Sequence, residues 1–221
     1  MATKPILFNA EMVRAILGGR KSCTRRIIKQ QPKGFFSAFE VSEEPLYIYD
    51  TDGNQEKITP PYQPGDILYV RETFAWCPCW DCGMDTEQGA CTDHIYHSEK
   101  KEHGCYMYRA SYEDNEYPSA DTWHPSIHMK KDIARIWLKV TDVRVERLQD
   151  ITEVGIRKEG IEVDPKECAG KFGFISELFL LFQRLWNSTI KKSDLDRYGW
   201  NANPWVWVIE FELCEKPKGE N

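Results

Sequence analysis

The stretch of this 221-residue chain with the most chemical potential is 18–26, which reads Gly-Gly-Arg-Lys-Ser-Cys-Thr-Arg-Arg. Four cations and three hydroxyl or thiol groups follow the glycine pair within seven residues. The glycines permit a sharp turn at positive φ and a close approach of the backbone to a ligand. Lys21, three residues before Thr24, places an amine near a hydroxyl, and the cations can hold a phosphate or orient a carbonyl. The alternative is a solvated basic turn that binds nothing.

A second set of reactive side chains lies in the segment 76–125, which is rich in Cys, His, Asp, Glu and Tyr and poor in aliphatic residues. We expect this segment to be an excursion from the core. Its donors exceed what a tetrahedral zinc site needs, and a closed, structural zinc would stabilise a segment with so little apolar content. Thiols without metal, or oxidised pairs, are the alternative. The expected ligands are Cys77, Cys79, Cys82, Cys91 and Cys105, with His94, His97 and His103 as further donors.

Aromatic and amide side chains gather before the C-terminal strand, at Trp200, Asn201 and Trp205. Aromatic rings stack on nucleobases, and asparagine can read a base edge. Because a packed corner of the fold also uses tryptophan, we expect one of Trp200 and Trp205 to touch a ligand, not both. Glu72 lies beside Arg71 at a strand end. It either lines the same ligand-binding cleft as the residues above or forms a strand-end ion pair, and the ion pair is the more common role.

A mixed set of helices and strands must position these residues. Apolar residues at helical spacing predict a helix between Asn9, its cap, and Gly18, and a longer amphipathic helix over 174–186. Alternating apolar and polar residues predict strands, and no strand–helix–strand repeat or Gly-rich phosphate loop occurs. This order favours an α+β fold with a largely antiparallel, barrel-like sheet. The expected strands are 5–8, 24–29, 46–49, 56–59, 67–72, 106–109, 134–140, 143–147 and 205–213, with a short helix after Thr152.

Composition narrows the class of protein. The formal net charge of −6 argues against strong duplex-DNA binding, so any nucleic-acid contact should be local. No apolar run is long enough for a membrane span, and the first residues lack the apolar region of a signal peptide. We therefore expect a cytoplasmic protein, in which the 8 cysteines do not form a disulfide framework.

Several pieces of the chain, in order, resemble the ASCH domain family, whose members have a PUA-like β-barrel fold. They are residues 16–26, 62–70, 140–143 with 148–153 and 159–160, and 207–211. The likeness is greatest to the larger ASCH-like proteins of phages and prophages. It implies a single domain over 1–221, with an antiparallel β-barrel, flanking helices and the Cys/His-rich insertion 76–125.

The resemblance also implies a cleft beside the barrel that takes a nucleoside or an RNA segment. Small bacterial members of the family are amidohydrolases that remove the acetyl group from N(4)-acetylcytidine, and their Lys-x-x-Thr motif and glutamate correspond to Lys21, Thr24 and Glu159. The lysine and threonine match without a gap, whereas Glu159 is matched by its distance from 151–153. The expected substrate-binding residues are Arg20, Arg25, Arg26, Glu72, Trp200, Asn201 and Trp205.

Amide hydrolysis needs an activated nucleophile, a proton shuttle and stabilisation of the oxyanion. Lys21 can serve as base for Thr24 only if its amine is partly neutral, which desolvation or the neighbouring arginines would favour. Glu159 would orient Lys21 or protonate the leaving amine. Alternatively, Thr24 positions a water, or the loop only shapes the RNA-binding turn of a noncatalytic module. Cleavage of RNA is a third and weaker reading.

Overall fold

The computed structural model describes residues 2–31, 46–49, 55–78, 95–97, 102–112, 122–163 and 174–217. The chain divides into two compact units. Unit 1 comprises Met1–Lys4, Ala15–Leu68 and Leu138–Glu215, and unit 2 comprises Pro5–Arg14, Tyr69–Trp137 and Lys216–Asn221. A single domain over 1–221 and an insertion over 76–125 stay predictions.

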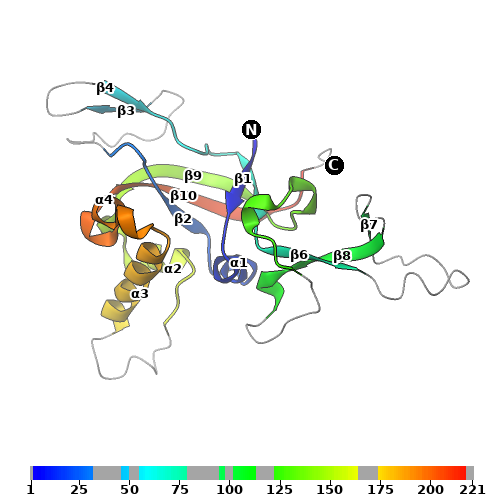
Figure 1. Ribbon diagram of the computed structural model, residues 1–221. Helices are drawn as coiled ribbons and strands as arrows, with labels where there is room; N and C mark the ends of the chain where they lie inside the picture. The colour runs from blue at the N-terminus through cyan, green and yellow to red at the C-terminus, as the bar shows by residue number, and fades with distance from the viewer. Residues whose placement is uncertain are drawn as a thin grey trace, which may run out of the picture. The chain divides into compact units, whose positions relative to one another are not determined.

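The described residues form strands, α-helices and short 3-10 helices (Figure 1). The strands are β1 (Thr3–Leu7), β2 (Cys23–Ile27), β3 (Leu46–Tyr49), β4 (Gln55–Ile58), β5 (Ile67–Arg71), β6 (Phe74–Pro78), β7 (Ile95–His97), β8 (Glu102–Tyr108), β9 (Trp137–Arg147) and β10 (Trp205–Cys214). The α-helices are α1 (Ala10–Leu17), α2 (Glu153–Lys158), α3 (Phe174–Ser188) and α4 (Leu195–Tyr198). The 3-10 helices are η1 (Arg109–Ser111), η2 (Ser126–His128), η3 (Lys131–Ile133), η4 (Leu148–Asp150), η5 (Lys192–Asp194) and η6 (Trp200–Ala202). The mixed α and β character expected from the sequence is confirmed.

The largest sheet has the strand order β1–β5–β9–β10–β2. β10 and β2 pair antiparallel, with Val208 opposite Arg25 and Ile209 opposite Thr24. β3 and β4 also pair antiparallel, with Leu46 opposite Ile58. In unit 2, β6, β8 and β7 form a separate three-stranded antiparallel sheet.

The predicted β-barrel is not closed, because β1 and β2 are the two ends of the five-stranded sheet. Just before β2, the backbone bonds both to β10, through the Ser22 carbonyl and the Phe211 N–H at 2.9 Å, and to the end of α2. The Ser22 N–H donates to the Lys158 carbonyl at 2.9 Å, and Lys21 forms a bridge with Glu159. These contacts join the segment before β2 to the end of α2.

The core of unit 1 lies where α2 and α3 pack against one face of β2 and β10 (Figure 1). Val206 and Val208 of β10 meet Leu178 and Phe182 of α3 in this cluster. Alternation along β10 explains the arrangement, because residues two apart share a face of the sheet. The core therefore fixes the helix side of β2, on which the candidate site is built. Among the described residues, no helix has both the length and the apolar content needed to cross a membrane.

Candidate functional site

The glycine turn folds as the sequence predicts. Asn9 caps α1 by accepting a hydrogen bond from the Met12 N–H at 2.8 Å, and the helix ends at Leu17. Gly19 then adopts φ 69°, and the Arg20 N–H reaches back to the Ala15 carbonyl at 2.8 Å. This pattern of backbone bonds is a common helix ending that requires a left-handed residue. It turns the chain directly into β2.

Lys21 lies in the interior of unit 1, not in solvent. Its side chain is 0% exposed, and Nζ donates to Glu159 Oε2 at 2.6 Å, to the Glu159 carbonyl at 3.0 Å and to the Cys23 carbonyl at 2.8 Å. Three acceptors match the three N–H donors of an ammonium group. The structure thus brings Lys21 and Glu159 together across 138 positions of sequence, as the resemblance implies.

Glu159 reaches Lys21 because α2 ends at this point. Thr152 caps the start of the helix through the Gly155 N–H, and Glu159 follows its last turn. Gly160 then turns the chain with φ 89°, where a side chain would be strained. A Cβ there would also lie 2.7 Å from the Ala15 Cβ and 3.0 Å from the Lys21 Cβ. Glycine at this position therefore permits the close approach of the two segments.

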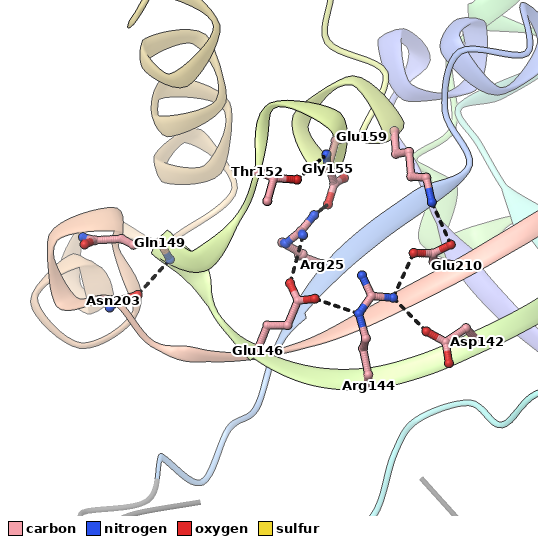
Figure 2. Close-up of polar contacts among 11 residues, drawn as sticks. Arg25, Asp142, Arg144, Glu146, Gln149, Thr152, Gly155, Glu159, Asn203 and Glu210 are labelled. Carbon is pink, nitrogen blue, oxygen red and sulfur yellow. Dashed lines mark hydrogen bonds and ion pairs between the residues drawn. The ribbon is translucent and has the colours of Figure 1, made fainter. Parts of the chain in front are cut away.

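Arg25 holds the second oxygen of Glu159. Its Nη1 donates to Glu159 Oε1 at 3.2 Å, while its Nη2 donates to Glu146 Oε2 at 3.1 Å (Figure 2). The side chains of Arg25 and Glu159 are only 3% and 6% exposed. A Cβ on Gly155 would lie 3.2 Å from Arg25 Nη2, so this glycine makes room for the guanidinium. Lys21, Glu159 and Arg25 form a buried cluster, which we call the β2 charge cluster.

The ion pairs continue from the β2 charge cluster along β9 and β10. Arg144 Nε donates to Glu146 at 2.7 Å, and its Nη1 donates to Asp142 at 2.7 Å and to Glu210 at 2.8 Å (Figure 2). Burial disfavours the charged form of Arg144, but these three carboxylates outweigh it and raise the pKa of Arg144. Burial likewise disfavours the charged Glu210, but bonds from Lys158 and Arg144 outweigh it and lower the pKa of Glu210. Sequence reasoning missed Glu146 and Arg144, which alternation alone presents as ordinary exposed strand positions.

Thr24 and Arg26 belong to the other face of β2. The register places Thr24 opposite Ile209 and Arg26 opposite Trp207, so both alternate with Arg25. Thr24 is buried, and within the described residues its hydroxyl forms no hydrogen bond to Lys21 or Glu159. Burial lowers the pKa of Arg26 and raises that of Tyr62, the two groups interacting electrostatically.

Arg20 lies at the rim of the β2 charge cluster. Its side chain is 39% exposed, and Nη1 donates to the Gly160 carbonyl at 3.3 Å and lies 3.5 Å from Glu162. Of the three arginines expected to bind substrate, Arg20 is therefore exposed, Arg25 is buried and Arg26 is half-buried.

Cys23 shows how strongly this part of β2 is desolvated. Burial, with the nearby charge of Glu159, raises the pKa of its thiol to about 12. Because only the thiolate reacts, we expect alkylation of Cys23 by iodoacetamide at pH 8 to be roughly a thousandfold slower than that of an exposed thiol. Mass spectrometry of the Cys23 peptide, with urea-unfolded protein as the control, measures this rate. Equal rates in the folded and unfolded chain would contradict it.

Trp200 and Asn201 line a hollow of about 300 Å³ in unit 1, together with Asn187, Leu195, Asp196, Gly199 and Ala202. Trp205 does not line it. Its ring instead lies under the Arg147 guanidinium, 4.3 Å from the ring centroid. The structure thus separates the two tryptophans, while the expectation that one of them touches a ligand stays a prediction.

Glu72 belongs to unit 2, and its side chain is 1% exposed. Both of its oxygens accept from Arg135, at 2.8 and 2.9 Å, and Arg135 also stacks 4.2 Å from the centre of the Tyr108 ring. Arg71, the neighbour in sequence, donates to the Ser126 carbonyl. An ion pair is thus present, with a partner that sequence proximity did not suggest.

Two of the expected zinc ligands lie face to face in unit 2. Cys77 of β6 is directly opposite Cys105 of β8, and both are thiols. Side chains opposite each other in an antiparallel pair have Cβ atoms about 5 Å apart, which suits two ligands of one metal ion. Cys79, Cys82 and Cys91 lie outside the described residues, as does His94. Among the described residues alone, no group of three or more possible ligands is found.

No known family profile matches the chain, and no curated protein sequence is significantly similar to it. Among solved structures, the chain is similar to the high-resolution crystal structure of an ASCH domain from Lactobacillus crispatus JV V101. The two are 11% identical, the alignment covers 96% of this chain and 79% of the other, and the TM-score is 0.36. A likeness this distant carries no information about the chemistry of this chain.

Proposed function

We propose that this chain is an ASCH-type, PUA-like protein that binds a nucleoside or an RNA segment and hydrolyses the acetyl amide of N(4)-acetylcytidine or a related modified nucleoside. The observation that carries the proposal is the buried contact of 2.6 Å between Lys21 Nζ and Glu159 Oε2. Burying such a pair is costly, because desolvation offsets the attraction between the charges, and this cost makes the pair a candidate for a functional site.

Lys21 and Glu159 would act as the acid–base pair. Arg25 fixes one oxygen of Glu159, so the other stays directed at the Lys21 amine. A carboxylate held this way can exchange a proton with Lys21 and pass one to the leaving nitrogen of an amide. Since Thr24 lies on the opposite face of β2 from Arg25, a water nucleophile fits this arrangement better than the Thr24 hydroxyl.

Acetate release from N(4)-acetylcytidine tests the proposal. We expect release by the wild-type chain, and at least a hundredfold less by Lys21→Ala and by Lys21→Arg. Lys21→Arg is the sharper variant, because arginine keeps the positive charge but does not give up a proton near neutral pH. A melting curve for each variant separates lost chemistry from lost folding. Release by Lys21→Arg at the wild-type rate, or none by wild-type protein, would overturn the amidohydrolase role.

A noncatalytic binding module is the second candidate, and one observation favours it. Three acceptors already occupy the Lys21 ammonium, so the lysine needs a rearrangement before it can accept a proton. In that case the β2 charge cluster stabilises the turn, and the chain only binds. Equilibrium binding of the nucleoside or of short RNA, without acetate release, is the result that this candidate predicts.

We also propose that Cys77 and Cys105 are two ligands of a structural zinc ion, a proposal supported by their opposition across β6 and β8. Protein prepared without chelators should contain about one zinc per chain, measured by mass spectrometry. Cys77→Ser and Cys105→Ser should each lower the zinc content and the melting temperature. Cys214→Ser, a half-buried thiol in unit 1, is the matched control and should leave both unchanged. Full zinc content in Cys105→Ser would refute the assignment.

A further inference from the structure

The hollow beside α4 offers a binding site distinct from the β2 charge cluster. It is formed where α3 ends and where α4 and η6 follow, all within unit 1. At about 300 Å³ its volume suits one nucleobase with part of its sugar. The residues that give it chemical character are Asn187, Asp196, Trp200 and Asn201.

The walls of the hollow are held in place before any ligand arrives. The backbone N–H of Trp200 donates to Asn187 Oδ1 at 2.9 Å, and the backbone carbonyl of Trp200 accepts from Gln149 Nε2 at 2.8 Å. The Trp200 ring also packs edge-on against Phe182, with 5.8 Å between the ring centres. Since Phe182 belongs to the core cluster, the indole is anchored to the interior of unit 1. A site that is already ordered loses little entropy on binding.

The polar groups of the hollow specify a kind of ligand. Asp196 and Asn201 are exposed, and within the described residues neither forms a hydrogen bond or an ion pair. The side-chain oxygen of Asn187 accepts from the Trp200 backbone N–H, so the side-chain N–H groups of Asn187 remain as donors. The carboxylate of Asp196 can accept from two adjacent N–H groups of a ligand, and the amide of Asn187 or Asn201 can donate to a neighbouring carbonyl of that ligand. Guanine presents this arrangement on its Watson–Crick edge, while Trp200 supplies an aromatic surface for stacking.

The surrounding charge favours a nucleic-acid strand over an isolated base. Lys191, Lys192 and Arg197 are exposed and flank the hollow in sequence, and together they outnumber Asp194, the carboxylate among them that does not line the hollow. Arg197 and Tyr198 both donate to the carbonyl of Lys29, just beyond the end of β2. The strand β2, which carries Arg25 and follows Lys21 in sequence, is therefore tied to the α4 segment. Cations beside a base-sized hollow are what phosphate contacts require.

We propose that this hollow binds a guanine base of single-stranded RNA, with Asp196 reading its N–H edge and Trp200 providing the stacking surface. The inference rests on the proposed function only in taking nucleic acid as the class of ligand. The hollow would give the protein a preference for an RNA context, whereas the β2 charge cluster would act on the modified base.

Fluorescence anisotropy with labelled five-nucleotide RNAs tests this inference. We expect the sequence UUGUU to bind about tenfold more tightly than UUUUU or UUAUU, since a good bidentate contact discriminates to about that extent. Asp196→Asn should abolish the preference for guanine, and Asn201→Ala should weaken it. Asp150→Asn, which removes an exposed carboxylate of unit 1 outside the hollow, should leave both affinity and preference unchanged.

Two results would overturn the inference: equal affinity of the wild-type chain for the three RNAs, or a guanine preference that survives Asp196→Asn. Acetate release from the free nucleoside is a separate readout, and Asp196→Asn should not change it. Loss of the amidohydrolase role therefore leaves the guanine site standing, and failure of the guanine site leaves the amidohydrolase role untouched.

Discussion

Replacing Glu159 with glutamine should lower the free energy of unfolding by about 3–5 kcal/mol, the range seen when one member of a buried ion pair is removed. Glutamine keeps the size of the side chain but loses the charge that faces both Lys21 and Arg25. Since the side chains of Lys21 and Arg25 are 0% and 3% exposed, water cannot replace the lost carboxylate. Urea denaturation at pH 7, followed by circular dichroism, measures the change.

The matched control is Arg157→Ala, which breaks a surface pair with Glu153 in which the side chains are 45% and 39% exposed. We expect that variant to lose less than about 1 kcal/mol, because solvent screens exposed charges. The double variant Lys21→Met, Glu159→Gln should be less destabilised than the sum of its single variants, because it removes the stranded ammonium. Strict additivity, or a loss for Glu159→Gln no larger than for Arg157→Ala, would show that the pair is not coupled in this way.

Replacing Arg135 with leucine should lower the free energy of unfolding of unit 2 by about 3 kcal/mol. The change strands the Glu72 carboxylate, which is 1% exposed and accepts both of its side-chain hydrogen bonds from Arg135. It also removes the guanidinium that stacks on Tyr108. Differential scanning calorimetry is suited to this variant, because the two units need not unfold together.

Lys139→Ala provides the comparison for Arg135→Leu, because Lys139 and Glu212 form an exposed pair at 3.7 Å. We expect its melting temperature to match that of the wild type within about one degree. The double variant Arg135→Leu, Glu72→Leu should recover part of the loss, since two apolar side chains often replace a buried ion pair at little cost. A destabilisation of Arg135→Leu as small as that of Lys139→Ala would contradict the assigned role of the pair.

Local features of the fold were predictable where the signal lies within a few residues. The Asn9 cap, the end of α1 at the glycine pair and the apolar stripe of α3 all follow from propensity and periodicity. β10 was predictable for the same reason, because alternation over ten residues is a strong pattern. The resemblance grouped Lys21, Thr24 and Glu159, and the structure brings Lys21 to Glu159 but puts Thr24 on the other face of β2, while their roles stay predictions.

Contacts between distant segments escaped sequence reasoning. Arg135 could not be named as the partner of Glu72, because Arg71 is its neighbour in sequence and many cations are available. Glu146 carries no sign of its contact with Arg25, which depends on the register of strands that are not consecutive. A barrel was expected from the order of the elements and from the resemblance, but the five-stranded sheet is open, with β1 and β2 at its two ends.

The sequence by itself determined which chemical groups are present and which short elements carry them: a cationic turn after a helix, an aromatic and amide run before a strand, and a cysteine-rich segment. Tertiary structure decided what those groups face. It buried Lys21 against Glu159, put Thr24 on the opposite face of β2 from Arg25, and placed Trp200 in a hollow but Trp205 under an arginine. The physical reason is that propensity and periodicity act over a few residues, whereas ion pairing and burial depend on which distant segments the fold brings into contact.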